Sequence, residues 1–198
     1  MHLIRLRYGN TNTFLIPCKG GYLLLDTDCA GTLPAFYRAI KACGVRVRDI
    51  AYVLATHYHP DHMGLIPDLM EQGVRLLLAD TQTDRVHFSD HIYARTPQLG
   101  FVPICEAEAA VIPCGKSRGF LADIGIPGEI VSTPSHSPDS ISLILDDGVC
   151  LVGDLEPMEY LPAYEDNAAL AKDWDTLLRF QPRRICYAHV NETFMKEQ

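Results

Sequence analysis

The segment His57-Tyr58-His59-Pro60-Asp61-His62 decides how this chain of 198 residues is interpreted. It follows the apolar run 50–56, whose β-branched and aromatic residues predict a buried strand. After it, residues 63–72 carry apolar side chains at helical spacing, and Gly73 follows as a helix C-terminal residue. The three imidazoles and the carboxylate therefore lie on a strand-to-helix loop, where α/β sheets commonly place their chemistry.

The spacing within this loop predicts two neighbouring points of ligation. His57 and His59 are separated by one residue, so in extended backbone their side chains point the same way. Pro60 bends the chain, and Asp61 and His62 can then reach a second point beside the first. Imidazole and carboxylate are ligands of divalent metals such as zinc. The alternative is a polar surface loop in which Asp61 caps the following helix, but three histidines beside one aspartate favour a metal site.

The segment resembles the HxHxDH signature of the metallo-β-lactamase fold superfamily, and four further segments resemble the other motifs of that family in the same order. The resemblance spans about residues 12–189, nearly the whole chain. The further motif segments are Leu23–Thr27 with Asp26, Thr133–Ser140 with His136, Leu151–Asp154 with Asp154, and Arg184–His189 with His189.

The resemblance implies an α/β (α+β) fold, a four-layer αββα sandwich in which two mixed β-sheets pack face to face and helices cover the outer faces. Strand hairpins mixed with helices, in two sequential halves, fit that architecture. The length suits a single domain over residues 1–198. It leaves no room for the helical substrate domain of glyoxalase-II-like thioesterases or for the insertions of RNA-processing branches.

The resemblance also implies two divalent ions held by seven side chains. These are His57, His59 and His136 for the first ion, Asp61, His62 and His189 for the second, and Asp154 as the bridge. Zinc is expected, and ligation by nitrogen and oxygen alone leaves iron and manganese open. A hydroxide shared by the ions would attack a small-molecule ester, thioester or lactone. Asp61 would orient it and relay its proton, and Asp26 would fix a ligand imidazole through its other nitrogen.

The subclass depends on Asp154. True zinc β-lactamases usually carry Cys or Ser where glyoxalase-II-like and lactonase-like hydrolases carry the bridging aspartate, so antibiotic hydrolysis is disfavoured. The alternatives are a phosphodiesterase of the same fold, a non-hydrolytic redox protein and a metal-binding regulator. Candidate substrate contacts are Tyr58, Tyr160, Tyr164 and Arg118, each of which is also compatible with simple packing or solvation.

Composition bounds the partners and the compartment. The formal charge of −8 and a pI of about 5.4 disfavour nucleic acid. No apolar run approaches the roughly 20 residues of a membrane span. Charged residues interrupt each apolar stretch of the N-terminal segment, so we expect no signal peptide there. Seven cysteines without a C-x-x-C motif predict a reducing compartment and a cytoplasmic protein. The expected partner is a small-molecule substrate, and a homodimer is compatible with the sequence.

The remaining segments carry less specific expectations. A helix from Asp80 or Thr81 to Arg95 would place His87 and His91 on one face, exposed or lining a groove rather than binding metal. Residues 96–114 form an irregular loop, 116–125 a short helix, and Asn191 onward a tail helix. Strands are expected at 2–8, 13–17, 22–26, 75–79, 129–133, 140–145, 149–153 and 183–188, and helices at 33–43 and 168–180.

Overall fold

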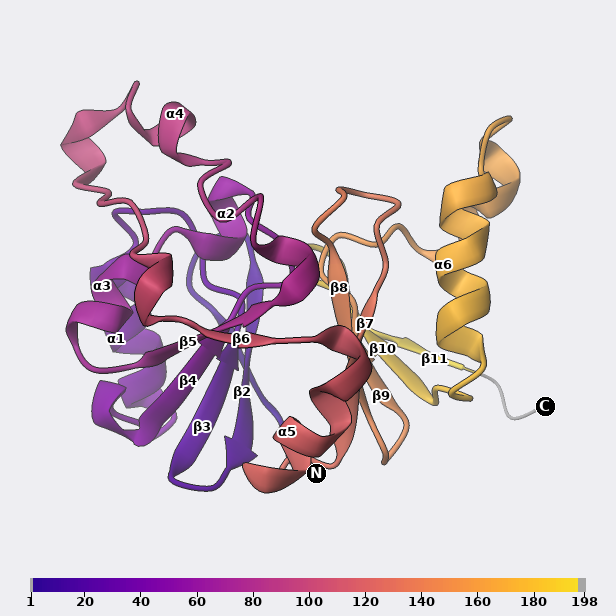
Figure 1. Cartoon of the computed structure of the whole chain (residues 1–198), viewed down its shortest axis with the longest axis horizontal. Coiled ribbons are helices and arrows are strands. Elements are labelled where there is room, and N and C mark those ends of the chain that lie inside the picture. Colours follow the sequence, from indigo (N-terminus) through magenta and orange to yellow (C-terminus); the bar gives the residue numbers. More distant parts are fainter. Residues whose placement is uncertain (1, 196–198) are drawn as a thin grey trace.

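The computed structural model describes residues 2–195, which form two β-sheets packed against each other (Figure 1). The first sheet has the strand order β1-β2-β3-β4-β5-β6. Its strands are β1 (Ile4–Arg7), β2 (Asn12–Cys18), β3 (Gly21–Leu25), β4 (Ile50–Leu54), β5 (Arg75–Ala79) and β6 (Ala110–Ile112). The second sheet has the order β11-β10-β9-β8-β7. Its strands are β7 (Gly128–Ser132), β8 (Ile141–Leu145), β9 (Val149–Leu151), β10 (Arg184–Cys186) and β11 (Thr193–Phe194).

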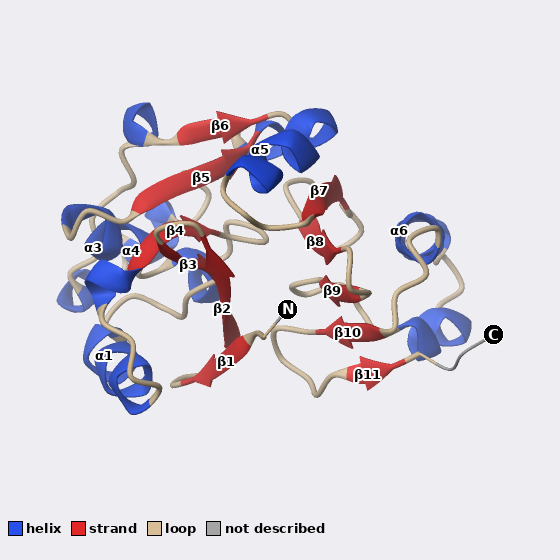
Figure 2. Cartoon of the chain, turned by 90° about the horizontal axis from the view of Figure 1, so that it is seen from below, coloured by secondary structure: helices blue, strands red, loops and turns tan. Residues whose placement is uncertain are grey.

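Helices cover the outer faces of both sheets, which confirms the αββα sandwich. In Figure 2 the two rows of strands face each other, with α1 (Leu33–Ala42) and α3 (Ile66–Glu71) on one side and α6 (Ala168–Leu178) on the other. The alternation of side chains along β3 shows how the layers are joined. Leu23 and Leu25 pack between the sheets, whereas Leu24 packs beneath the helices.

The strand directions bring five loops to one edge of the sandwich. In the first sheet β3, β4 and β5 run parallel, so the residues after β3 and β4 meet at the same edge. In the second sheet β9 and β10 are parallel, and β7 and β9 are each antiparallel to β8. The residues that follow β7, β9 and β10 therefore also lie together. Each of these five loops contains one of the sequence motifs.

The single helix expected over residues 63–72 is wrong, because the structure has two short helices there, α2 (Pro60–Met63) and α3. Pro67 has no N–H to donate to the carbonyl of Met63, so the helical hydrogen bonding cannot continue. Gly64 also approaches the chain at Ala30 so closely that a Cβ would lie 2.2 Å from its backbone nitrogen.

The helix expected from Asp80 to Arg95 is also wrong. The structure has a 3-10 turn η2 (Asp80–Gln82), irregular turns and only a short α4 (Asp90–Tyr93). Two buried side chains explain the difference, because they bond to backbone carbonyls of residues 55–62, the metal loop that carries the first candidate ligands, instead of lying along a helix. The Gln82 amide donates to the carbonyl of Ala55 at 2.9 Å, and the Ser89 hydroxyl donates to the carbonyl of Tyr58 at 2.6 Å.

Several smaller features complete the fold. Residues 96–114 include two 3-10 turns (Pro97–Leu99 and Glu106–Glu108) and the strand β6, which the sequence did not reveal. Helix α5 (Ser117–Asp123) forms as expected and ends near Gly125, which has a φ of +83°. The expected tail helix is wrong for residues 193–194, which form β11, while residues 196–198 lie outside the described part.

Two further features of the described residues concern the cysteines and the length of the helices. All seven cysteines carry free thiols, and Cys150 and Cys186 are buried. None of the helices within residues 2–195 is long and apolar enough to cross a membrane.

Candidate metal centre

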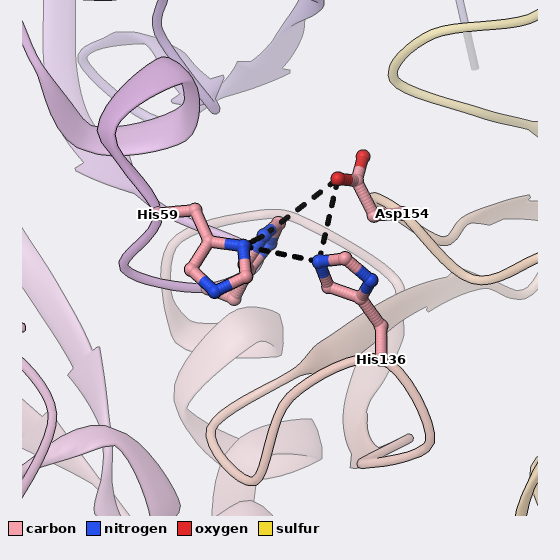
Figure 3. Close-up of side chains that lie close together, drawn as sticks. His59, His136 and Asp154 are labelled. Carbon is pink, nitrogen blue, oxygen red and sulfur yellow. Dashed lines mark hydrogen bonds and ion pairs between the residues drawn. The ribbon is translucent and has the colours of Figure 1, made fainter.

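The first group of candidate ligands joins the two halves of the chain. His57 and His59 follow β4, and His136 lies on the loop between β7 and β8. His59 Nδ1 lies 3.0 Å from His57 Nε2 and 3.1 Å from His136 Nε2. Asp154, after β9, places its Oδ2 3.4 Å from His136 Nε2 and 3.8 Å from His57 Nε2. Figure 3 shows His59 approaching from one side and His136 and Asp154 from the other.

The second group lies on the other oxygen of the same aspartate. His62 and His189 face each other with their Nε2 atoms 3.3 Å apart. Asp154 Oδ1 lies 3.2 Å from His62 Nε2 and 3.1 Å from His189 Nε2. Asp61 Oδ2 lies 3.2 Å from His189 Nε2 and 3.9 Å from His62 Nε2. Asp154 thus stands between the two groups with one oxygen turned to each.

These donor atoms fit divalent ions. Two nitrogen ligands at 2.0–2.1 Å from a tetrahedral ion are separated by roughly 3.3 Å, close to the 3.0–3.3 Å between paired imidazole nitrogens here. Asp154 Oδ1 is shielded from solvent, and the imidazole nitrogens of His62 and His189 lie 3.2 and 3.1 Å from it. A buried carboxylate oxygen that faces two imidazole nitrogens is a suitable ligand set for a cation shared by all three side chains. The two sets, His57, His59, His136, Asp154 and Asp61, His62, His189, form a candidate dinuclear metal site.

Asp26 lies beneath the site and bonds to the metal loop. Its Oδ2 accepts hydrogen bonds from Thr56 Oγ1 at 2.9 Å and from His62 Nδ1 at 3.1 Å, and its Oδ1 accepts one from the Thr56 amide at 2.6 Å. Because Nδ1 of His62 contacts Asp26, its Nε2 is free to face His189 and Asp154. Asp26 has a φ of +59°, a conformation that Asp and Asn tolerate better than most residues.

Thr56 and Gly153 belong to this support, and neither was identified from the sequence. Gly153 has a φ of +57°, and a Cβ on it would lie 2.4 Å from Thr56 Oγ1. A side chain at residue 153 would therefore push Thr56 away from Asp26. The close packing of these two residues explains the glycine that precedes Asp154.

Two histidines of the first group, His57 and His136, are held in the neutral state. Burial, together with the neighbouring imidazole of His62, moves the pKa of His57 far below its ordinary value, although Asp154 opposes this shift. Burial also lowers the pKa of His136. Both side chains therefore present uncharged imidazoles near pH 7, the form in which histidine binds metals.

The second group forms a charged network instead. The carboxylates of Asp154 and Asp61 raise the pKa of His189 to about 10. Burial lowers the pKa of His62, but Asp26 and Asp154 outweigh it and raise the value to about 10. In return, the contact with His189 lowers the pKa of Asp61. Burial alone would raise the pKa of Asp154, but His189 and His62 bring it well below its ordinary range.

Two buried carboxylates hold the ligand loops in place, and both were missed in the sequence. Asp139 accepts a hydrogen bond from the amide of Tyr58 at 2.7 Å and so joins the His136 loop to the His57 loop. Asp173 on α6 accepts one from the amide of Ser135 at 2.7 Å. Asp173 could have been found, because it lies among the apolar residues of the buried face of its helix.

A small pocket of about 240 Å³ opens beside the first group. It is lined by Ser135, His136, Glu156, Tyr164, Asp166, Asn167, Ala169 and Leu170. Tyr164 is therefore near the site, and its hydroxyl donates a hydrogen bond to Glu156 at 3.0 Å. Tyr160 is exposed on the neighbouring 3-10 helix (Met158–Ala163) and is not among the lining residues.

The structure separates the other two candidate substrate contacts from the site. Tyr58 is completely buried in the core beneath the first sheet, so a direct contact of its hydroxyl with substrate is wrong for this conformation. Arg118 forms ion pairs with Glu129 and Asp146, at the end of the second sheet away from the His136 loop. These ion pairs favour the surface role of Arg118 over a role in substrate binding.

Comparisons of this chain with a family model, with curated proteins and with solved structures agree with the fold described above. The family model of the metallo-beta-lactamase superfamily matches residues 6–189, and the chain belongs to that superfamily. "Beta-lactamase-like protein 2 homolog" of Drosophila melanogaster is 24% identical over 181 residues, which cover 91% of this chain and 59% of that protein. The chain thus spans less than two thirds of this curated relative's length.

Two solved structures share the fold at low sequence identity. TTHA1623, solved in a di-iron-bound form, is 21% identical with a TM-score of 0.68, and the match covers 98% of this chain and 94% of that chain. FIM-1 from Pseudomonas aeruginosa, a metallo-beta-lactamase solved in the mono-zinc form, is 19% identical with a TM-score of 0.65 and coverage of 96% and 83%.

Proposed function

We propose that this protein is a dinuclear metal-dependent hydrolase of a small-molecule ester, thioester or lactone. The observation that carries the proposal is the position of Asp154, whose two oxygens face two separate groups of imidazoles. Two divalent ions bound there would activate water as a nucleophile and polarise a carbonyl group. The pocket beside His136 would then hold part of the substrate next to the reacting carbonyl.

Within this proposal Asp61 handles the proton. Its carboxylate is partly exposed, faces His189 and has a lowered pKa, so it is ionised near pH 7 and able to accept a proton. Thr11 fixes the backbone of Asp61, because its hydroxyl donates to the Asp61 carbonyl at 2.7 Å. Asp26 orients His62 through Nδ1, and Asp139 and Asp173 keep the ligand loops in register.

Zinc is the metal that we propose, and the donor chemistry supports it because imidazole and carboxylate are both zinc ligands. The structural neighbours carry zinc in one case and iron in the other. Metal analysis of protein purified under anaerobic conditions tests this choice. Two zinc ions per chain are expected, and a content dominated by iron would contradict zinc and favour a redox role.

The pocket supports acyl substrates over phosphodiesters. Its lining includes the carboxylates of Glu156 and Asp166 and no Lys or Arg. Phosphate groups are normally bound by Arg, Lys or clustered N–H donors, and two carboxylates would repel them. Asp154 further favours lactonase-like or thioesterase-like chemistry over β-lactam hydrolysis.

The decisive experiment is a screen of the metal-loaded protein. Lactones, thioesters and aryl esters would be compared with bis-p-nitrophenyl phosphate and with a β-lactam under the same conditions. We expect turnover of at least one acyl class and none of the phosphodiester. Cleavage of the phosphodiester alone would show the alternative activity, and no turnover across the panel would favour a metal-binding regulator.

A further inference from the structure

Phe88 is an aromatic side chain that lies beside a candidate ligand yet remains open to solvent. Its ring centroid is 5.2 Å from that of His59 and 5.9 Å from that of His91. About 38% of its surface is exposed, which is unusual for a phenylalanine. Its contact with His59 places it at the first group, and His136 of the same group lines the pocket.

The segment that carries Phe88 is fixed to the metal loop. The buried Ser89 hydroxyl donates to the carbonyl of Tyr58 at 2.6 Å. The hydroxyl of Tyr93 donates to the carbonyl of Pro60 at 2.7 Å and accepts from the amide of Ala30 at 2.9 Å. The carbonyls of Tyr58 and Pro60 flank His59 on both sides, so the position of Phe88 is set relative to this ligand.

From this arrangement we propose that Phe88 is a specificity-determining residue that packs against an aliphatic or aromatic acyl group of the substrate. The inference rests on the proposed function. A carbonyl placed at the two ion-binding groups has an apolar surface on the His59 side and the polar pocket on the His136 side. Burying an acyl chain against Phe88 would remove both apolar surfaces from water. The substrate would therefore be an ester, thioester or lactone with an apolar acyl chain.

The test is the dependence of hydrolysis on acyl chain length. Zinc-loaded protein would be assayed with the p-nitrophenyl esters of acetate, butyrate, hexanoate and octanoate. Each methylene fully removed from water contributes about fourfold in affinity. We expect kcat/KM to rise with chain length in the unsubstituted protein. Phe88→Ala should reduce the octanoate-to-acetate ratio by about tenfold, and Phe88→Leu should restore most of it.

A binding measurement keeps the inference separate from turnover. Acetohydroxamate and octanohydroxamate bind metals through the same group and differ in their apolar tails. Calorimetry on the zinc-loaded protein should show a preference for octanohydroxamate that Phe88→Ala loses. The two proposals can fail separately. If no ester is cleaved, but the unsubstituted protein prefers octanohydroxamate and Phe88→Ala does not, the proposed hydrolase activity is wrong while the role of Phe88 in binding an apolar acyl group is supported.

The matched control is Phe194→Ala on β11. Phe194 is also an exposed phenylalanine, with 67% of its surface open, and it lies on the edge strand of the second sheet. This variant should retain the chain-length preference and the metal content. An unchanged preference in Phe88→Ala would overturn the inference. A loss that is equal for all chain lengths and accompanied by lower zinc content would also overturn it, because Phe88 would then only support His59.

Discussion

The histidines of the two candidate ligand groups have pKa values that their surroundings move in opposite directions. The first group contains His57 and His136, and the second contains His62 and His189. Burial lowers the pKa of His57 and of His136. Carboxylates raise those of His62 and His189 to about 10. His57 and His136 are therefore ready to bind a cation near neutral pH, whereas His62 and His189 must release protons before they do.

The difference comes from where the carboxylates lie. Asp26 and Asp154 both contact His62, and Asp61 and Asp154 both contact His189. In the first group Asp154 Oδ2 is the one carboxylate oxygen, at 3.4–3.8 Å from its imidazoles. One aspartate can therefore face two groups of unlike charge, one through each of its oxygens.

Removing the shared residue should disable both groups. Asp154→Ala leaves His62 and His189 without their common carboxylate, so hydrolysis should fall by about 10³-fold or more. The metal content should drop from two ions per chain to one or fewer, as measured by mass spectrometry of the metal. Asp154→Asn is the matched variant that keeps the size of the side chain. Two ions retained in Asp154→Ala would show that Asp154 is not a bridge.

Asp61→Ala should affect only the second group. Hydrolysis should fall by at least about 10²-fold because proton transfer and one ligand are lost, while the circular dichroism spectrum should stay unchanged. Asp175→Ala on the exposed face of α6 is the control and should hydrolyse normally. Turnover preserved in Asp61→Ala would remove this residue from the proposed mechanism.

Asp26→Ala should weaken the fold as well as the second group. It leaves three donors of Thr56 and His62 without their buried acceptor, which should lower the free energy of unfolding by about 3 kcal/mol. Metal affinity of the second group should fall roughly 10- to 100-fold. Chemical denaturation and metal titration measure the two effects. Asp26→Asn tolerates the positive φ and should lose less stability, so equal losses in both variants would contradict this account.

The metal-free protein should be most stable near pH 6.5. The raised pKa of His62 and of His189 stabilises the fold below about 6.5, and this contribution is lost as the pH rises toward 10. The lowered pKa of His57 and of His136 has the opposite sign, because the unfolded chain gains protons below 6.5 that the folded chain excludes. Thermal unfolding from pH 5 to 10 measures both limbs. A melting temperature that rises steadily through pH 8 and above would refute the charged second group.

Tyr58→Phe is expected to have the smallest effect. The Tyr58 hydroxyl is buried without a hydrogen-bond partner among the described residues, so removing it should leave stability unchanged or raise it by up to about 1 kcal/mol. Hydrolysis should stay within about twofold, because the side chain does not reach the site. A loss of activity with unchanged stability would instead indicate that the hydroxyl contacts substrate in another conformation.

The elements that the sequence predicted well are those with a strong local signal. Residues 75–79 form a strand with the expected bounds, and α1 and β8 end within one residue of their expected limits. The failures lie where side chains bond to distant backbone. Gln82 and Ser89 resemble helix residues by spacing, but their hydrogen bonds to Ala55 and Tyr58 override that preference.

The ligands in residues 57–62 were visible from their spacing, and His136, Asp154 and His189 were visible because their segments resemble the further motifs of the metallo-β-lactamase superfamily. The roles of Asp139 and Thr56 were not visible, because both act through hydrogen bonds to residues distant in sequence, Asp139 with the amide of Tyr58 and Thr56 with Asp26. The sequence assigned no role to Phe88. Its exposure beside His59 depends on the fold of residues 80–93.

The sequence by itself determined the αββα architecture and the set of side chains able to bind two ions, since five segments resemble the motifs of one superfamily and occur in the same order. The tertiary structure decided how these side chains differ. Whether a histidine is neutral or charged depends on which carboxylates and how much protein surround it. The burial of each histidine and its contacts with carboxylates arise only when β3, β4, β7, β9 and β10 bring their ends to one edge. No local pattern in the sequence could therefore predict them.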